Sequence, residues 1–239
     1  MLRLSIAFVA VAGSFAARAA DKMSHSVVGW SADGRYFAFE RSVMLDGSGY
    51  PMCEVAIIDA DSGELSAGPF KAVLEDTRIL PEHACVAARS DAQGAMEFRR
   101  IDPALKGKRL KLAQTAPPAH IGTAARTIGI KFREGARACI LLVTETPARS
   151  EPPEWVLYAW HLGLSCDGEE HMLRCTECDK EPPLAAGIRI VEVRSHQDRI
   201  AVFLERSTRG FEGFDVTPIV SASRLPVASS GRAADGGSR

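Results

Sequence analysis

The feature that most constrains the fold is the stretch from Val27 to Tyr50, in which two tight-turn signals separate runs of strand-forming residues. The first turn, Ser31–Gly34 (SADG), combines an aspartate that bonds its own backbone with a glycine that accepts positive φ. The second, Asp46–Gly49 (DGSG), leads into another β-run at Val55–Ile58. Two hairpin signals so close together predict antiparallel sheet for this region.

Between the turns, the run from Arg35 to Glu40 carries apolar residues at both alternating positions, as in Phe37 and Ala38. A strand with one face in water alternates polar and apolar residues instead. The pattern therefore predicts a strand that is covered on both faces.

Later segments also read as strands, with one short helix near residues 82–92 that follows Pro81, a residue tolerated in the first helical turn. Gly163–Gly168 (GLSCDG) echoes Gly29–Gly34 (GWSADG), although a propeller should show more copies at regular spacing. We therefore expect a mainly β protein with an irregular, sandwich-like antiparallel fold, with a small TolB-like β-propeller as the alternative. The remaining predicted strands are 126–132, 138–144, 155–162, 188–193, 200–204 and 216–220.

The N-terminus has the layout of a secretory signal peptide: one early cation, Arg3, a short apolar run, and small residues around Ala19. We predict a signal peptide at 1–19, one β-rich domain at 20–225 and a disordered Ala, Ser and Gly-rich tail at 226–239. No later segment is long and apolar enough to predict a membrane helix. The expected location is the periplasm or the extracellular medium.

Charge argues against a general affinity for nucleic acid. The chain has 29 Lys and Arg against 30 Asp and Glu, and loss of residues 1–19 would remove two Arg and no acid, which changes the net charge from −1 to −3. A local basic run at Lys106–Lys111 is expected to be a solvated turn, with contact to an anionic surface as the alternative.

The cysteines predict disulfides, because an exported chain enters an oxidising compartment. Six cysteines allow fifteen pairings, so their number does not fix the connectivity. Cys139 lies in an apolar strand and is expected to be a buried thiol or a cross-strand partner. The disulfide candidates are Cys53, Cys85, Cys139, Cys166, Cys175 and Cys178.

Three of these cysteines share one polar loop with a histidine. Thiolate and imidazole are zinc ligands, so Cys166, His171, Cys175 and Cys178 form an alternative zinc site. Their spacing is not a standard one and disulfide formation competes with metal binding, so we prefer a structural bridge and expect no cofactor. A redox pair of Cys175 and Cys178 is a third alternative, without the βαβ surroundings of thioredoxins.

The motifs WSADGRYFAFE and DGSGYP resemble the opening of a family of predicted secreted bacterial proteins of unknown function. Members of that family typically begin with GFSPDGRYFAFE and DGSGFP and carry a GFEG-type signature near the C-terminus, here Gly210–Gly213. The resemblance implies location and ancestry and carries no activity. The Ser-x-Asp-Gly-x-Tyr-x-Ala-Phe pattern also occurs in the blades of TolB-like periplasmic propellers.

The two glycine-rich loops are the candidate binding site. Asp46, Ser48, Tyr50, Phe211 and Glu212 could meet at one rim and hold a partner segment or a small ligand. The structural alternative is that glycine is needed in these loops only for a positive φ.

Two functions stay open on the sequence. The chain has no Gly-x-Ser-x-Gly elbow, no His-Glu-x-x-His and no phosphate-cradling glycine loop, which favours a non-enzymatic module that binds an envelope protein or a small ligand. The alternative is an exported hydrolase with an unrecognised site. Asp46 facing Glu212 in a cleft would favour the hydrolase, whereas an open apolar surface or an uncovered sheet edge would favour the binding module.

Overall fold

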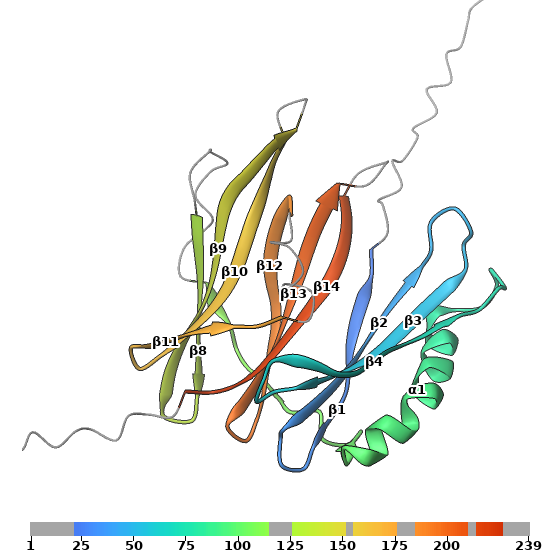
Figure 1. The fold of residues 1–239 in the computed structure, drawn as a ribbon, viewed down its shortest axis with the longest axis horizontal. Helices are drawn as coiled ribbons and strands as arrows, with labels where there is room; N and C mark the ends of the chain where they lie inside the picture. The colour runs from blue at the N-terminus through green and yellow to red at the C-terminus, as the bar shows by residue number, and fades with distance from the viewer. Residues whose placement is uncertain (1–21, 115–125, 152–154, 176–184, 210–213, 227–239) are drawn as a thin grey trace, which may run out of the picture.

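The computed structural model describes residues 22–114, 126–151, 155–175, 185–209 and 214–226. These residues form three antiparallel sheets and one helix (Figure 1). The predicted signal peptide lies outside the described residues, and so does the predicted tail from residue 227 onward.

The first sheet, here called the N-terminal sheet, has the strand order β4-β3-β2-β1-β5. The predicted turn between its first two strands is confirmed, because Gly34 has a φ of 72° and its N–H donates to the Ser31 carbonyl at 2.8 Å. The strands are β1 (Ser24–Ser31), β2 (Tyr36–Met44), β3 (Pro51–Asp59), β4 (Glu64–Val73) and β5 (Ile101–Asp102).

The helix α1 (Pro81–Phe98) joins β4 to β5 and lies against one face of the N-terminal sheet. Its buried residues Ala84, Cys85, Ala88 and Ala92 recur at helical spacing and form the face that packs on β3. The predicted helix is therefore confirmed, although it runs six residues beyond 92. No helix in the described part of the chain combines the length and apolar character needed to cross a membrane.

Two further sheets follow along the chain. The outer sheet has the order β11-β10-β9-β8-β7 and the middle sheet the order β14-β13-β12-β6. The outer sheet consists of β7 (Ala113–Gln114), β8 (Arg126–Glu134), β9 (Arg137–Glu151), β10 (Trp155–Cys166) and β11 (Glu169–Leu173). The middle sheet consists of β6 (Lys108–Arg109), β12 (Gly187–His196), β13 (Arg199–Arg209) and β14 (Phe214–Arg224).

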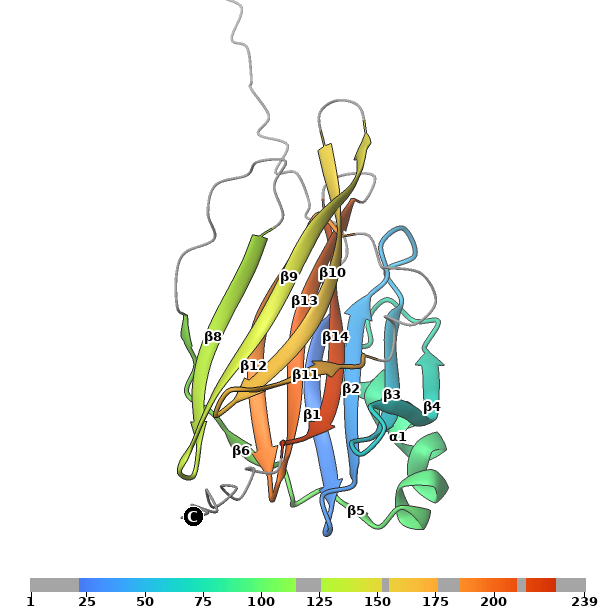
Figure 2. The same cartoon turned by 60° about the vertical axis from the view of Figure 1, so that its left-hand side comes forward.

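The sheets stack face to face in the order helix, N-terminal sheet, middle sheet, outer sheet (Figures 1 and 2). β13 shows how the middle sheet serves both neighbours. Val202 and Leu204 pack in a core cluster with residues of the outer sheet, whereas Ala201 and Phe203 pack with residues of the N-terminal sheet. Strand alternation thus places two cores on the two faces of one sheet.

The sandwich-like expectation is confirmed, with three sheets instead of two. The N-terminal sheet packs its far face on α1 and not on the outer sheet, so these layers do not close into a ring of blades. The prediction that β2 is covered on both faces is also confirmed, because Ala38 packs towards α1 and Phe37 towards the middle sheet.

One segment that reads as a connector is strand up to Glu151. The three prolines of residues 146–154 predict an exposed link, but β9 continues to Glu151 and β10 begins at Trp155. The register with β10 shifts between Leu157 and Tyr158, opposite this segment, so a bulge accommodates Pro147 within the pair.

An ion-pair network ties the N-terminal sheet to the middle sheet. Arg199 of β13 bonds Asp61 at 2.9 Å, in the turn after β3, and Asp198 at 2.6 Å. Arg35 bonds Asp59 of the same turn at 2.8 Å, and Arg224 bonds Asp198 at 2.7 Å.

Burial would raise the pKa of Asp59, but the hydrogen bond and charge of Arg35, together with hydrogen bonds from the backbone of Asp61 and Ser62, outweigh it, and the pKa lies below its usual value. The pKa of Asp198 is lowered in the same way, because Arg224 and Arg199 outweigh the effect of burial. Both carboxylates are therefore held in their charged form in the folded protein.

Candidate functional site

The DGSG loop between β2 and β3 is a turn held by its own polar groups. The Gly47 N–H donates to Asp46 Oδ1 at 2.9 Å, and the Tyr50 N–H donates to Ser48 Oγ at 3.2 Å. Gly47 and Gly49 have φ values of 80° and 66°, a conformation that favours glycine. Asp46 and Ser48 border a recess of about 830 Å³ together with Lys22 and Pro81.

The other half of the predicted rim, Phe211 and Glu212, lies outside the described residues. β13 ends and β14 begins at the same end of the molecule as the DGSG turn (Figure 1). A single rim formed by the two glycine-rich loops therefore stays a prediction.

Two disulfides join pairs of described residues, and each fixes a different element. Cys53–Cys85 joins β3 to α1, and Cys139–Cys166 joins the facing strands β9 and β10. Cys139 is thus a cross-strand partner, one of the two roles expected for it. Disulfides are typical of exported proteins.

The third predicted bridge concerns the loop after β11. Cys175 is disulfide-bonded, whereas Cys178, the remaining cysteine of the chain, lies outside the described residues. Cys166 is bonded to Cys139 and is not a free thiolate for zinc, and His171 lies exposed on β11. The alternative zinc set therefore lacks two of its four proposed ligands, Cys166 and Cys175, because both sulfurs are held in disulfides.

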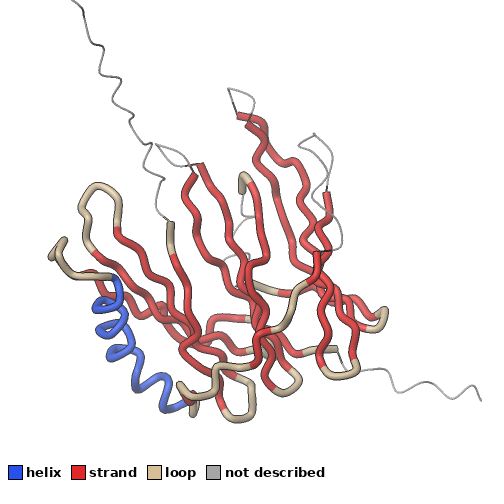
Figure 3. Tube along the Cα trace, turned by 180° about the vertical axis from the view of Figure 1, so that it is seen from behind, coloured by secondary structure: helices blue, strands red, loops and turns tan. Residues whose placement is uncertain are grey.

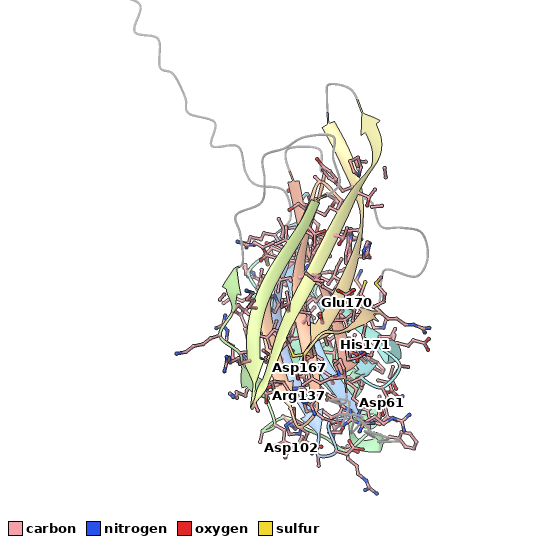
Figure 4. All side chains as sticks on the ribbon, turned by 90° about the vertical axis from the view of Figure 1, so that its left-hand side faces the viewer. Asp61, Asp102, Arg137, Asp167, Glu170 and His171 are labelled. Atoms are coloured by element: carbon pink, nitrogen blue, oxygen red, sulfur yellow. A yellow bond between two sulfur atoms is a disulfide. The ribbon has the colours of Figure 1, made fainter. Side chains whose placement is uncertain are left out.

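The outer sheet differs from its neighbours because it leaves one face uncovered. Phe132, Cys139 and Leu141 point into the inter-sheet core, and the residues between them are exposed or half-buried. In the described part of the chain, no helix or sheet packs on these alternate residues, and Figure 4 views the molecule from this side. We call this surface the open face; its residues are Thr127, Gly129, Lys131, Arg133, Ala138, Ile140, Leu142, Thr144, His161, Gly163, Ser165, Glu170 and Met172.

The centre of the open face is apolar and indented. Leu142 pairs with Gly129 on one side and Gly163 on the other, so its side chain stands between two positions without side chains. Met172, opposite Gly163, is 67% exposed. Together with the half-buried Ile140 and Leu142, it makes this part of the face a candidate interaction surface.

A groove of about 750 Å³ lies beside this centre, where the segment after β6 crosses from the middle sheet to the outer sheet. It combines cations with apolar groups, and among the described residues that line it none is acidic. We call it the basic groove; it is lined by Lys108, Arg109, Leu110, Lys111, Ala113, Lys131, Phe132, Arg133, Ala138, Cys139 and Ile140.

Part of this positive charge is uncompensated. Lys108 lies 3.9 Å from Glu134, and Arg109 lies 3.7 Å from Glu192. The other three cations, Lys111, Lys131 and Arg133, have no ion-pair partner among the described residues. An anion in the groove would therefore meet free ammonium and guanidinium groups.

A second hollow of about 310 Å³ lies farther along the same sheet and is lined by residues that include Leu142, His161, Gly163 and Met172. Glu170, which is labelled in Figure 4, also borders this hollow on the side of β11. The open face thus has a basic side at β7 and β8 and, at β11, a mixed side that combines the acidic Glu170 with His171 and the apolar Met172.

The sequence contained a signal for this site, although the predicted site lay elsewhere. Residues 108–111 of the basic run supply one wall of the groove, and contact with an anionic surface is the alternative interpretation of that run. Lys131 and Arg133 alternate with Ile130 and Phe132, which is typical of a strand with one open face.

Comparison with known proteins gives a family and no activity. No curated protein and no solved structure matches the chain. Residues 38–224 match the model of a family described as "Predicted secreted protein (DUF2259)". Since this match covers most of the chain and the disulfides agree with a place outside the cytoplasm, the protein belongs to this family of predicted secreted proteins.

Proposed function

We propose that this exported protein is a non-enzymatic binding module whose ligand lies on the open face and is held by the basic groove. The observation that carries the proposal is that three cations of the groove lack ion-pair partners among the described residues, beside exposed apolar side chains. A ligand site combines such an apolar surface with a few convergent polar groups.

The chemistry of the groove supports binding over hydrolysis. Among its described lining residues there is no carboxylate, hydroxyl or imidazole to serve as a general acid, general base or nucleophile, and Cys139 is held in a disulfide. Its cations suit recognition of an anionic group.

Native and denatured intact mass spectrometry of the protein recovered from the periplasm tests this proposal. We expect a non-covalent adduct that survives native conditions and is lost on denaturation. In the variant Lys131→Glu/Arg133→Glu, both of whose altered residues are exposed, the adduct should be absent while the melting temperature changes little.

The control is Lys71→Glu/Arg78→Glu, which makes the same change in net charge at exposed positions on β4 and after it. This variant should keep the adduct. An adduct that is equally abundant in all three proteins would contradict the groove as the site. Turnover of ester or glycoside substrates that disappears in the groove variant would establish the hydrolase instead.

A further inference from the structure

We infer that the ligand of the open face is a single-chain anionic amphiphile, with its head group in the basic groove and its acyl chain over the apolar centre. This inference rests on the proposed binding function and adds the chemistry of the ligand.

The inference of an anionic head group follows from the cations of the groove that have no ion-pair partner among the described residues. Lys131 and Arg133 are two residues apart on β8, so their side chains project from the same face, and Lys111 lines the same groove. A carboxylate or phosphate oxygen can accept charge-assisted hydrogen bonds from such a cluster. A neutral or cationic head group would leave these charges unpaired.

The inference of an acyl chain follows from the apolar residues that lie next to the cations. Lys131 pairs directly with Ile140, and Arg133 pairs with Ala138. From Ile140 the apolar surface continues along β9 to Leu142, beside which Gly163 lines the second hollow. A flexible chain without polar groups matches this surface, because every methylene it buries is removed from water.

The size of the two hollows agrees with a small molecule. Ligand sites typically enclose roughly 300–1,000 Å³, and the basic groove and second hollow hold about 750 and 310 Å³. The mixed side at Glu170 is unsuited to an extended anionic surface. We therefore favour a free amphiphile over an anionic bilayer or an acidic protein, which become outcomes of the test.

Calorimetric titration of the mature protein with defined probes provides the test. The probes are dodecanoate and octanoate below their micellar concentrations, butyrate, and dodecyl maltoside, which has the same chain length with an uncharged head. We expect dodecanoate to bind one to one. Its affinity should exceed that of octanoate by up to about 250-fold, because each of its four additional methylenes contributes roughly a three- to fourfold gain in affinity when it is buried. Butyrate and dodecyl maltoside should bind at least about tenfold more weakly than dodecanoate.

Two variants test the head-group site and the acyl-chain site separately. Lys131→Glu/Arg133→Glu should weaken dodecanoate at least about tenfold, while the control Lys71→Glu/Arg78→Glu should not. Gly163→Trp places a large ring beside Leu142, where an added Cβ would meet only ordinary contacts, and it leaves all the cations of the groove in place. It should abolish the dependence on chain length without changing the melting temperature.

The outcomes distinguish the inference from the proposed function. Equal affinities for butyrate and dodecanoate, or tight binding only to vesicles of phosphatidylglycerol or to polyglutamate, would overturn the amphiphile and leave a binding module with another anionic ligand. Equal weakening by the groove variant and its control would overturn the placement of the head. No binding by any probe, together with no adduct in the native mass spectrum, would overturn both.

Discussion

The N-terminal sheet and the outer sheet have similar strand arrangements but differ in what covers the face that points away from the middle sheet. Both are antiparallel, and both contain a similar strand-turn sequence, at Gly29–Gly34 (GWSADG) and Gly163–Gly168 (GLSCDG). The N-terminal sheet carries α1 on the face that points away from the middle sheet, whereas the corresponding face of the outer sheet is uncovered among the described residues (Figure 3).

The helix that closes the first sheet is an insertion between two of its strands. The chain leaves β4 at Val73, forms α1 and returns at Ile101 as β5. In the outer sheet, β8 to β11 follow one another without such an element in the described residues. The difference teaches that the N-terminal sheet uses its far face for stability, whereas the outer sheet leaves the corresponding face accessible to the ligand proposed above.

The largest expected contrast comes from matched truncations on the two far faces. Ile57→Ala, at a fully buried position against α1, should lower the free energy of unfolding by about 2–5 kcal/mol. Leu142→Ala, on the open face, should cost about 1 kcal/mol or less, because its side chain is only half-buried. Urea unfolding measures both, and equal costs would mean that the outer sheet is covered in solution.

Removal of the disulfides sharpens the same contrast. The sequence separations are 32 and 27 residues, so Cys53→Ala/Cys85→Ala and Cys139→Ala/Cys166→Ala should each cost about 2–4 kcal/mol. The first variant alone should speed amide hydrogen exchange in α1, since it removes the covalent link between helix and sheet. Faster exchange of α1 in the second variant would show that the two layers are more strongly coupled than the structure indicates.

Two alanines allow a gentler comparison. Ala88→Leu should cost about 1–3 kcal/mol, because Ala88 is fully buried between α1 and the sheet and a larger side chain would overpack that layer. Ala138→Leu on the open face should change stability by no more than about 0.5 kcal/mol. Thermal unfolding followed by circular dichroism distinguishes these values.

The smallest expected effect is on the free energy of unfolding at acidic pH. The pKa values of Asp59 and Asp198 are lowered in the folded protein, so their stabilising contribution is complete above the unfolded pKa of about 3.9 and is lost as the pH falls through the lowered folded values. Unfolding free energies measured from about pH 5 to pH 2.5 should therefore decline less steeply in Arg35→Ala than in the parent protein. Lys131→Ala, on the open face, should retain the parent slope.

The local features of the fold could be predicted from the sequence, whereas the stacking of the three sheets could not. The turn at Gly34 and the two-sided burial of β2 depend on neighbouring residues, so pattern and turn chemistry were sufficient. Helix α1 was expected to end near 92, and its continuation to Phe98 depends on packing against the sheet.

The pairing of Cys139 with Cys166 needs the register of β9 against β10, which spacing does not give. The open face was missed for a related reason. The alternation at Lys131 and Arg133 is visible in the sequence, but which sheet face stays uncovered is decided by the stacking of three sheets.

The order of the layers also bears on how this chain matures. The middle sheet, on which both other sheets pack, takes three of its four strands from residues 187–224, after the strands of its two neighbours have been made. The inner faces of those neighbours, including Phe37 and Leu162, have no partner until this last segment arrives. A polypeptide arranged in this way completes its interior late, and its late completion suits a chain that crosses a membrane before it folds.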